Sequence, residues 1–241
     1  MKLKQALAGI AALASFSAAH AQSANTFYVT TGWFHFAPQD SSDPLKIDSV
    51  GGDQRPVVIP NTGAHVGTSD TFGFSLGYFI TDHIAAEAEL GIPPKFDIYG
   101  EGLLSPLGKI ASAKLWSPAL LLKYYFNTPD SKLRPYVGIG GTYVWFTQAQ
   151  ITNGNFTNSP ALGGPTSAST DSSWAPVFNV GFNYNFTKHW FAGFSLSYIP
   201  VNVIATLNTQ KQTQVGVLSQ KAEAKIHLNP IVTYLKVGYA F

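Results

Sequence analysis

The chain has 241 residues and no cysteine, and charged residues make up only 12% of it while aromatic residues make up 14%. Soluble domains carry about 25% charged residues, so this composition is unusual for one. The lack of cysteine excludes a disulfide framework and a thiolate metal site, and a formal charge of +2 without any basic run argues against a nucleic-acid surface.

The first residues are typical of an export signal. Lys2 and Lys4 precede an apolar run over residues 6–16, and Ala19-His20-Ala21 is a small-residue cleavage site. We therefore predict a signal peptide over residues 1–21 and a mature domain over residues 22–241. An uncleaved anchor is the alternative, but the run is shorter than the ~20 residues that a membrane helix needs. Cleavage leaves 13 basic and 13 acidic residues, so the mature chain has no formal net charge.

The remaining chain shows repeated alternation of apolar and small or polar residues, which is the period of a β-strand. The clearest case is residues 71–80, where Phe72, Phe74 and Leu76 alternate with glycine and serine. Eight segments carry such a pattern: residues 26–36, 71–80, 84–92, 109–126, 132–147, 174–186, 190–199 and 230–241. An even number of strands returns both ends of the chain to the same side.

The terminal segment, residues 230–241, shows what kind of sheet these strands form. Leu235, Val237, Tyr239 and Phe241 lie on one apolar face, opposite Lys236 and small residues. A soluble sheet would leave this strand as an exposed, apolar edge. A closed barrel in a bilayer removes the edge and gives the apolar face a solvent. We expect Leu235, Val237, Tyr239 and Phe241 also to form the C-terminal signal that the barrel-assembly machinery recognises.

The connections between the segments alternate between long and short. The short ones are turns at residues 81–83, 127–131 and 187–189. The long ones, such as residues 38–70 and 148–173, are rich in Ser, Thr, Asn, Gly and Pro, so we expect exposed loops rather than further domains. The pattern predicts an all-β fold: an eight-stranded antiparallel transmembrane β-barrel with short periplasmic turns and long extracellular loops. A soluble β-sandwich is the alternative.

Aromatic residues gather near the ends of the predicted strands, where they would form two interfacial belts. Those beside the long loops are Trp33, Trp145 and Trp174, and those beside the short turns or the terminus are Tyr124, Phe186, Trp190, Tyr239 and Phe241.

Several segments together resemble the outer membrane protein W (OmpW) family. They are residues 132–140 (KLRPYVGIG), Ser173-Trp174 with Val180-Gly181 and Tyr184, the turn before Trp190, residues 81–84 with Glu87 and Pro93, and the ending from Leu228 to Phe241. The resemblance covers nearly the whole mature chain. It implies a barrel in the Gram-negative outer membrane that passes small hydrophobic molecules inward and releases them sideways into the bilayer.

The residues that face the predicted barrel interior divide by height. An apolar funnel is expected toward the long loops, formed by Phe34, Phe36, Leu121, Val144, Phe146 and Val177. A polar plug is expected toward the short turns, where acids pair with bases across the bore, formed by Glu87, Glu89, Lys123, Arg134, Tyr136 and Lys236. An eight-stranded barrel has room for little more than side chains, so an open water channel is not expected. The alternative role of the plug is stability alone.

Prolines mark one place in the predicted wall. Pro93 and Pro94 end the third strand and Pro118 lies on the fourth, and proline cannot donate a ladder hydrogen bond. We therefore expect a lateral opening between these two strands. The alternative is that the prolines only begin loops.

The sequence gives little support for an enzyme, a phosphate-binding loop or a metal site. Residues 73–77 match the G-x-S-x-G pattern of hydrolases, but the alternation runs straight through Ser75, and the pattern needs a strand-turn-helix elbow. The glycines of residues 138–141 lie within a strand, and the histidines show no metal spacing. We expect no enzyme activity, no cofactor and a monomer. Two functions remain: passage of small hydrophobic molecules, or a structural or surface-receptor barrel whose loops bind phage or bacteriocins.

Overall fold

The computed structural model describes residues 22–159, 162–214 and 216–241; the predicted signal peptide lies outside these residues. Eight antiparallel strands close into a barrel, and each lies within or overlaps one of the predicted segments. In order around the barrel they are β10 (Ala119–Tyr125), β7 (Ile84–Gly91), β6 (Ser69–Phe79), β1 (Phe27–Ala37), β17 (Ile231–Ala240), β14 (Trp190–Tyr198), β13 (Ser173–Asn185) and β11 (Leu133–Ile151). Pairing of β10 with β11 closes the cylinder, so the predicted eight-stranded barrel is confirmed.

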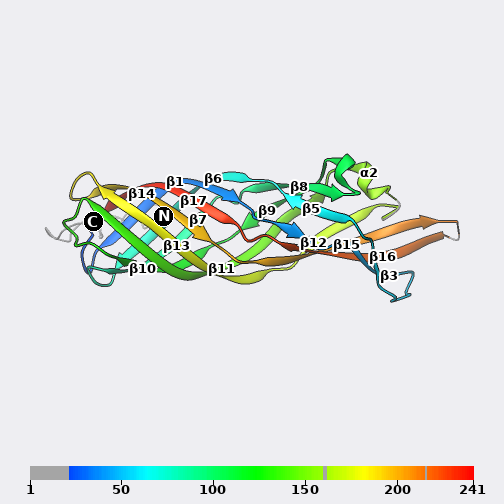
Figure 1. Cartoon of the computed structure of the whole chain (residues 1–241), viewed down its shortest axis with the longest axis horizontal. Coiled ribbons are helices and arrows are strands. Elements are labelled where there is room, and N and C mark those ends of the chain that lie inside the picture. The colour runs from blue at the N-terminus through cyan, green and yellow to red at the C-terminus, as the bar shows by residue number, and fades with distance from the viewer. Residues whose placement is uncertain (1–21, 160–161, 215) are drawn as a thin grey trace, which may run out of the picture.

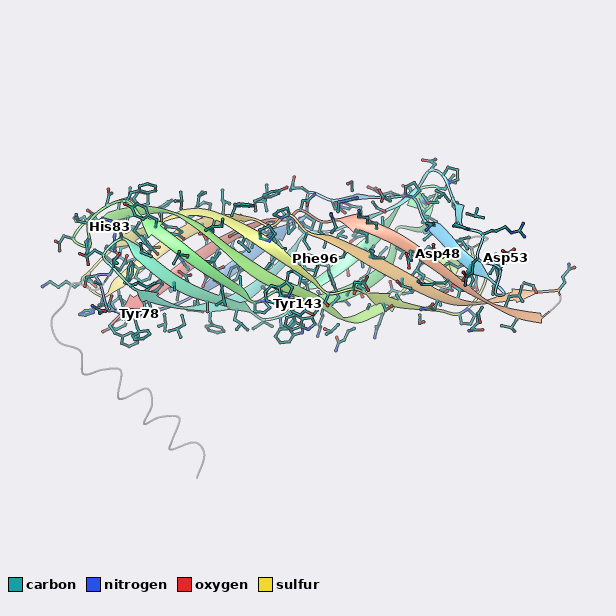
Figure 2. All side chains as sticks on the ribbon, turned by 90° about the horizontal axis from the view of Figure 1, so that it is seen from below. Asp48, Asp53, Tyr78, His83, Phe96 and Tyr143 are labelled. Atoms are coloured by element: carbon teal, nitrogen blue, oxygen red, sulfur yellow. The ribbon has the colours of Figure 1, made fainter. Side chains whose placement is uncertain are left out.

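The alternation in sequence becomes a division between outside and inside. Outward side chains are large and apolar, and they remain exposed on the isolated chain: 61% for Phe72, 69% for Leu120 and 76% for Trp174. Figure 2 shows such side chains all around the barrel half. A continuous apolar exterior of this extent requires lipid rather than water. No helix in the described residues is long and apolar enough to cross a membrane.

The short turns lie at one end of the barrel together with both ends of the described chain. The Phe241 backbone N–H donates to the Phe27 carbonyl at 3.0 Å. The rings of His83 and His189, one in each of two short turns, lie 2.8 Å from the carbonyls of Tyr125 and Ala240. This end is therefore held together by hydrogen bonds to main-chain carbonyls, two of them from histidine side chains, as well as by strand pairing.

The fourth predicted strand is wrong in one respect, because residues 109–126 form two strands. β9 (Lys109–Trp116) ends before Ser117-Pro118, and β10 begins after it. β10 pairs with β7 and β11 in the barrel, whereas β9 pairs with β8 (Lys95–Gly102) and the upper part of β11. The break falls at Pro118, whose ring nitrogen cannot donate to a neighbouring strand.

The long connections are not the irregular loops that their composition predicts. They form further strands that continue the molecule beyond one end of the barrel, toward the right of Figure 1. One group, β5 (Thr62–Val66), β8 and β9, extends the barrel sheet. The other is a separate sheet of β12 (Thr166–Thr170), β15 (Asn202–Thr213), β16 (Gly216–His227), β3 (Lys46–Val50) and β4 (Val57–Val58), with β2 (Ser41–Ser42) beside β16. Two short helices, η2 (Ser105–Leu107) and α2 (Gly154–Thr157), complete this extracellular extension.

Candidate functional site: the barrel interior

The lower half of the barrel interior, toward the short turns, contains a buried ion cluster. Lys123 Nζ lies 2.9 Å from Glu87 Oε2 and 3.2 Å from Glu89 Oε1, and Lys236 Nζ lies 3.3 Å from Glu87 Oε1. The side chains of Glu87, Lys123 and Lys236 have no solvent exposure. Two acids and two bases make the cluster neutral, which is the condition under which buried charges are tolerated.

Aromatic groups complete this cluster. The Tyr28 hydroxyl donates to Glu87 Oε2 at 2.5 Å, and the Tyr136 ring lies 5.0 Å from Lys123 Nζ and 5.5 Å from Lys236 Nζ. Tyr28 was missed in the sequence because both faces of its strand carry aromatics. The residue paired with Tyr28 on the next strand is Gly77, and a glycine there leaves room for a large inward side chain. Gly77 lies so close to the Tyr28 ring that an added Cβ would lie 2.0 Å from Cζ.

Arg134 differs from the expectation that it pairs with an acid of the plug. Its guanidinium donates to three main-chain carbonyls: Gln22 at 2.6 Å, Asp82 at 2.5 Å and Asn127 at 3.3 Å. Arg134 lies at the start of β11, close to the turns, where carbonyls without strand partners are available. It therefore ties the N-terminal segment to two turns and seals the barrel below the ion cluster.

The upper half of the interior is apolar. Of the six predicted funnel residues, five are buried in one apolar cluster, namely Phe34, Phe36, Leu121, Val144 and Val177, and Phe146 packs against it while half-buried. The cluster also includes residues that were not singled out in the sequence, among them Tyr234, whose ring stacks on Phe34 at 3.8 Å between centroids. Tyr234 carries a polar hydroxyl and lies two residues from Lys236, so its position did not suggest the apolar half.

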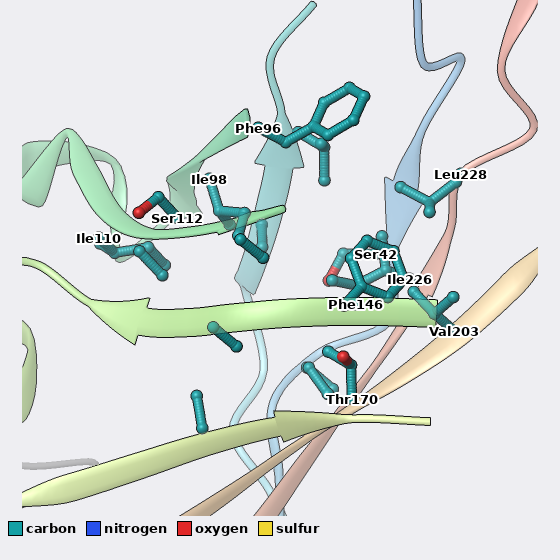
Figure 3. A pocket seen from close by; sticks show the side chains of 18 of the residues that line it. Ser42, Phe96, Ile98, Ile110, Ser112, Phe146, Thr170, Val203, Ile226 and Leu228 are labelled. Carbon is teal, nitrogen blue, oxygen red and sulfur yellow. The ribbon is translucent and has the colours of Figure 1, made fainter. Parts of the chain in front are cut away.

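An apolar cavity of about 120 Å³ lies above the funnel, between the two sheets of the extension (Figure 3). Its lining comes from the barrel rim and from β8, β9, β11, β12, β15 and β16. The labelled side chains of Phe96, Ile98, Phe146, Val203 and Ile226 surround it. Apolar faces on strands that extend beyond the lipid are favourable only if they are buried against one another. The strands of the extension therefore pack their apolar faces around this cavity.

A second cavity, of about 40 Å³, lies directly below the first. The two share Phe36 and Leu115 as lining residues, so these side chains stand between the cavities. The lower cavity reaches Glu89 of the ion cluster, and it also reaches Leu90, Gly91, Pro94 and Ser117 in the wall.

The wall beside this second cavity is interrupted. Pairing of β7 with β10 ends at Glu89 opposite Ala119. The next main-chain bond between these two parts of the wall runs from Leu115 N–H to the Pro94 carbonyl at 3.0 Å. Within the described chain, no main-chain bond joins residues 90–93 to residues 116–118.

The predicted proline positions coincide with this interruption. Pro93 and Pro94 connect β7 to β8, and Pro118 connects β9 to β10. Pro94 is buried and lines the second cavity, whereas Pro93 and Pro118 are half-buried. Each proline also lies where a strand ends, so the position fits both a wall opening and the start of an extension.

The C-terminal strand has the expected orientation. Leu235 and Val237 face outward with 47% and 42% exposure, and the Tyr239 ring contacts Trp190 and Phe241 at 5.1 and 5.3 Å between centroids. These aromatics form the belt beside the short turns. At the other end of the barrel, Trp145 and Trp174 both contact Tyr143.

Enzyme or metal chemistry finds no support in the described residues. Ser75 lies within β6 with its hydroxyl 2.6 Å from that of Thr30, without the turn that a hydrolase nucleophile requires. No group of three or more His, Cys, Asp or Glu in this part of the chain is arranged to hold a metal ion.

A closed eight-stranded barrel with an apolar exterior, aromatic belts and a long extension at one end is an outer membrane β-barrel protein. The OmpW family model matches residues 23–241, and the chain belongs to the OmpW family. It is 30% identical to outer membrane protein W of Vibrio cholerae serotype O1, over 99% of this chain and all of that protein.

Two further similarities are informative. The crystal structure of the outer membrane protein OprG from Pseudomonas aeruginosa superposes with a TM-score of 0.77 at 26% identity, covering 91% of this chain and 97% of OprG. The dibenzothiophene metabolism operon protein PahQ of Pseudomonas aeruginosa is 25% identical over 76% of this chain and 77% of its own length. The protein is therefore an outer membrane barrel, as the sequence predicted.

Proposed function

We propose that this barrel gives small hydrophobic molecules a passive route through the outer membrane. The observation that carries the proposal is the stack of two cavities, which share Phe36 and Leu115 as lining residues. The upper cavity is apolar, and the lower one has a mixed lining that ends at Glu89 of the ion cluster. A hydrophobic molecule would lose its apolar surroundings if it continued downward through the ion cluster. The favourable direction from the second cavity is therefore sideways.

The exit in this proposal is the interruption of the wall between β7 and β10. Leu90, Gly91 and Pro94 line the second cavity on one side and Ser117 on the other, and main-chain pairing resumes only above them. Lipid contacts the outer surface here, so a hydrophobic molecule would pass from one apolar environment to another. The name of PahQ, which refers to the metabolism of dibenzothiophene, is consistent with a hydrophobic aromatic cargo.

Uptake measurements test this function. The rate at which cells take up a small apolar aromatic, such as naphthalene, should fall when the protein is absent and return when it is restored. Replacement of Pro93, Pro94 and Pro118 by alanine should slow uptake while leaving folding intact, because alanine can restore main-chain pairing across the wall. Equal uptake with and without the protein would contradict the function, whereas equal uptake by the proline variant would contradict only the exit.

The alternative is a surface receptor, in which the extension binds a partner and the interior only stabilises the barrel. Exchange of residues 46–58, which include β3 and β4 and line neither cavity, for those of another family member distinguishes the two. Partner binding should follow the exchanged segment, whereas uptake should follow the cavity and wall residues.

A further inference from the structure

A belt of aromatic side chains marks the outer edge of the lipid-facing surface where the barrel meets the extension. The indole rings of Trp116 on β9 and Trp145 on β11 stack with centroids 5.7 Å apart and planes 1° apart. Tyr143 contacts Trp145 at 5.6 Å and Trp174 at 5.0 Å. Tryptophan and tyrosine at this position of a membrane barrel lie at the level of the lipid headgroups.

Directly beyond the two indoles, three polar side chains form a row across three adjacent strands. Lys114 on β9 is paired with Thr147 on β11 on one side and with Lys95 on β8 on the other. Directly paired residues lie on the same face of a sheet, and Lys114 lies two residues from Trp116, so the row is ~7 Å beyond the indoles on the same outward face.

The two lysines of this row face each other, and the acid on the same face of β8, Asp97, is bound to Lys109 rather than to either of them. Across the described residues, neither Lys95 nor Lys114 makes an ion pair, while the neighbouring Lys109 is bound to Asp97 at 2.7 Å. Lys95 is exposed and Lys114 is half-buried. Like charges directly opposite each other on a sheet are destabilising, and an anion between them removes this cost.

We propose that Lys95, Lys114 and Thr147 bind a phosphate group on the headgroup of an outer-leaflet lipid. Two ammonium groups and a hydroxyl supply donors suited to a phosphate, and the stacked indoles immediately below offer a flat surface for the glycolipid backbone and the start of its acyl chains. The depth of the row selects a lipid rather than a free anion, because the indoles hold this surface at the membrane boundary. The site is independent of solute passage, although it lies just above the interrupted wall.

Binding of a defined lipid tests this inference. Native mass spectrometry of the full chain in detergent would compare a diphosphorylated glucosamine lipid of the lipid A type with the same lipid after enzymatic removal of its phosphates. The wild-type protein should retain the phosphorylated lipid. The double variant Lys95→Gln, Lys114→Gln should bind it about tenfold more weakly or worse, as expected for loss of charge-assisted contacts. The variant Lys95→Arg, Lys114→Arg should retain binding.

A second pair of lysines gives the matched control. Lys132 and Lys188 lie near the short turns at the opposite end of the barrel, so Lys132→Gln with Lys188→Gln makes the same change of charge at the other interface. This variant should bind as the wild type does. Equal retention of the dephosphorylated lipid, an equal loss in the control variant, or displacement of the lipid by millimolar inorganic phosphate would overturn the proposal. Heat-dependent gel mobility confirms that each variant is folded.

Discussion

Below Glu89 the barrel interior is filled by paired charges and aromatic rings, whereas above it the interior is lined by apolar side chains and contains cavities. Both halves use the same eight strands, so the difference comes from their inward residues and from the end of β7–β10 pairing at Glu89. In the lower half, small residues such as Gly77 make room for large polar side chains. In the upper half, strand pairing is interrupted and the interior is not filled. One barrel therefore combines a rigid closed end with an accessible apolar end.

The largest expected effect concerns the closed end. Lys123→Met should destabilise the barrel by about 3–5 kcal/mol, because it leaves Glu87 and Glu89 with one base between them in a buried site. Addition of Glu89→Gln to this variant should recover much of the loss, because it leaves the ion pair between Glu87 and Lys236 at 3.3 Å. Urea unfolding in lipid vesicles measures both. Wild-type stability of Lys123→Met would show that the cluster does not hold this end closed.

The next effect concerns the open end. Leu115 lines both cavities, so Leu115→Trp should narrow the connection between them and slow uptake of naphthalene without a large loss of stability. Leu122 faces lipid with 50% exposure, and Leu122→Trp is the matched control that should leave uptake unchanged. If both variants take up the solute at the wild-type rate, the path does not run past Leu115.

A smaller effect is expected where the two halves meet. The Tyr234 hydroxyl is 2.8 Å from that of Thr30, while its ring stacks on Phe34. Tyr234→Phe removes the hydrogen bond and keeps the stack, so it should cost about 0.5–1.5 kcal/mol. Chemical unfolding in lipid vesicles would detect this loss, and a cost as large as that of Lys123→Met would place Tyr234 in the ion cluster instead.

The smallest effect contrasts a buried ion pair with an exposed one. Arg55 and Asp53, on the extension, are 2.6 Å apart and exposed, and the hydrogen bond from Arg55 lowers the pKa of Asp53. A carboxyl with a lowered folded pKa contributes stability above its unfolded pKa and loses it as the pH falls through the folded value. Solvent screening makes this contribution negligible. Arg55→Gln should therefore raise the pKa of Asp53 in an NMR titration, yet leave the unfolding midpoint unchanged at neutral and at acid pH.

Sequence alone was sufficient for the barrel but not for its extension. Each barrel strand has lipid on one side, so alternation such as Phe72, Gly73, Phe74 reports its two environments directly. β15 and β16 lie in water beyond the lipid and carry mixed polar residues, so their composition resembles that of a loop. Their apolar face packs around the extension cavity and on the funnel cluster, in which Val203 and Ile226 are buried. This packing cannot be inferred without knowing which strands meet there.

The sequence predicted some residues of the barrel interior correctly and others not, for a related reason. Glu87, Glu89, Lys123 and Lys236 could be grouped because burial forces opposite charges together. Arg134 also had to be paired, but main-chain carbonyls satisfy it, and the sequence gives no sign of which carbonyls lack partners. The split at Pro118 was likewise not evident, because alternation continues across it while the strand changes neighbours.

The most direct test of sideways passage uses the absence of cysteine from the chain. Ser117→Cys places a single thiol at the interrupted wall, and Ser167→Cys places one on the exposed extension as a control. Modification of each with the same bulky thiol reagent, followed by measurement of naphthalene uptake, should reduce uptake to the level of cells without the protein for Ser117→Cys and leave it unchanged for Ser167→Cys. Full uptake through the protein modified at position 117 would contradict an exit between β7 and β10.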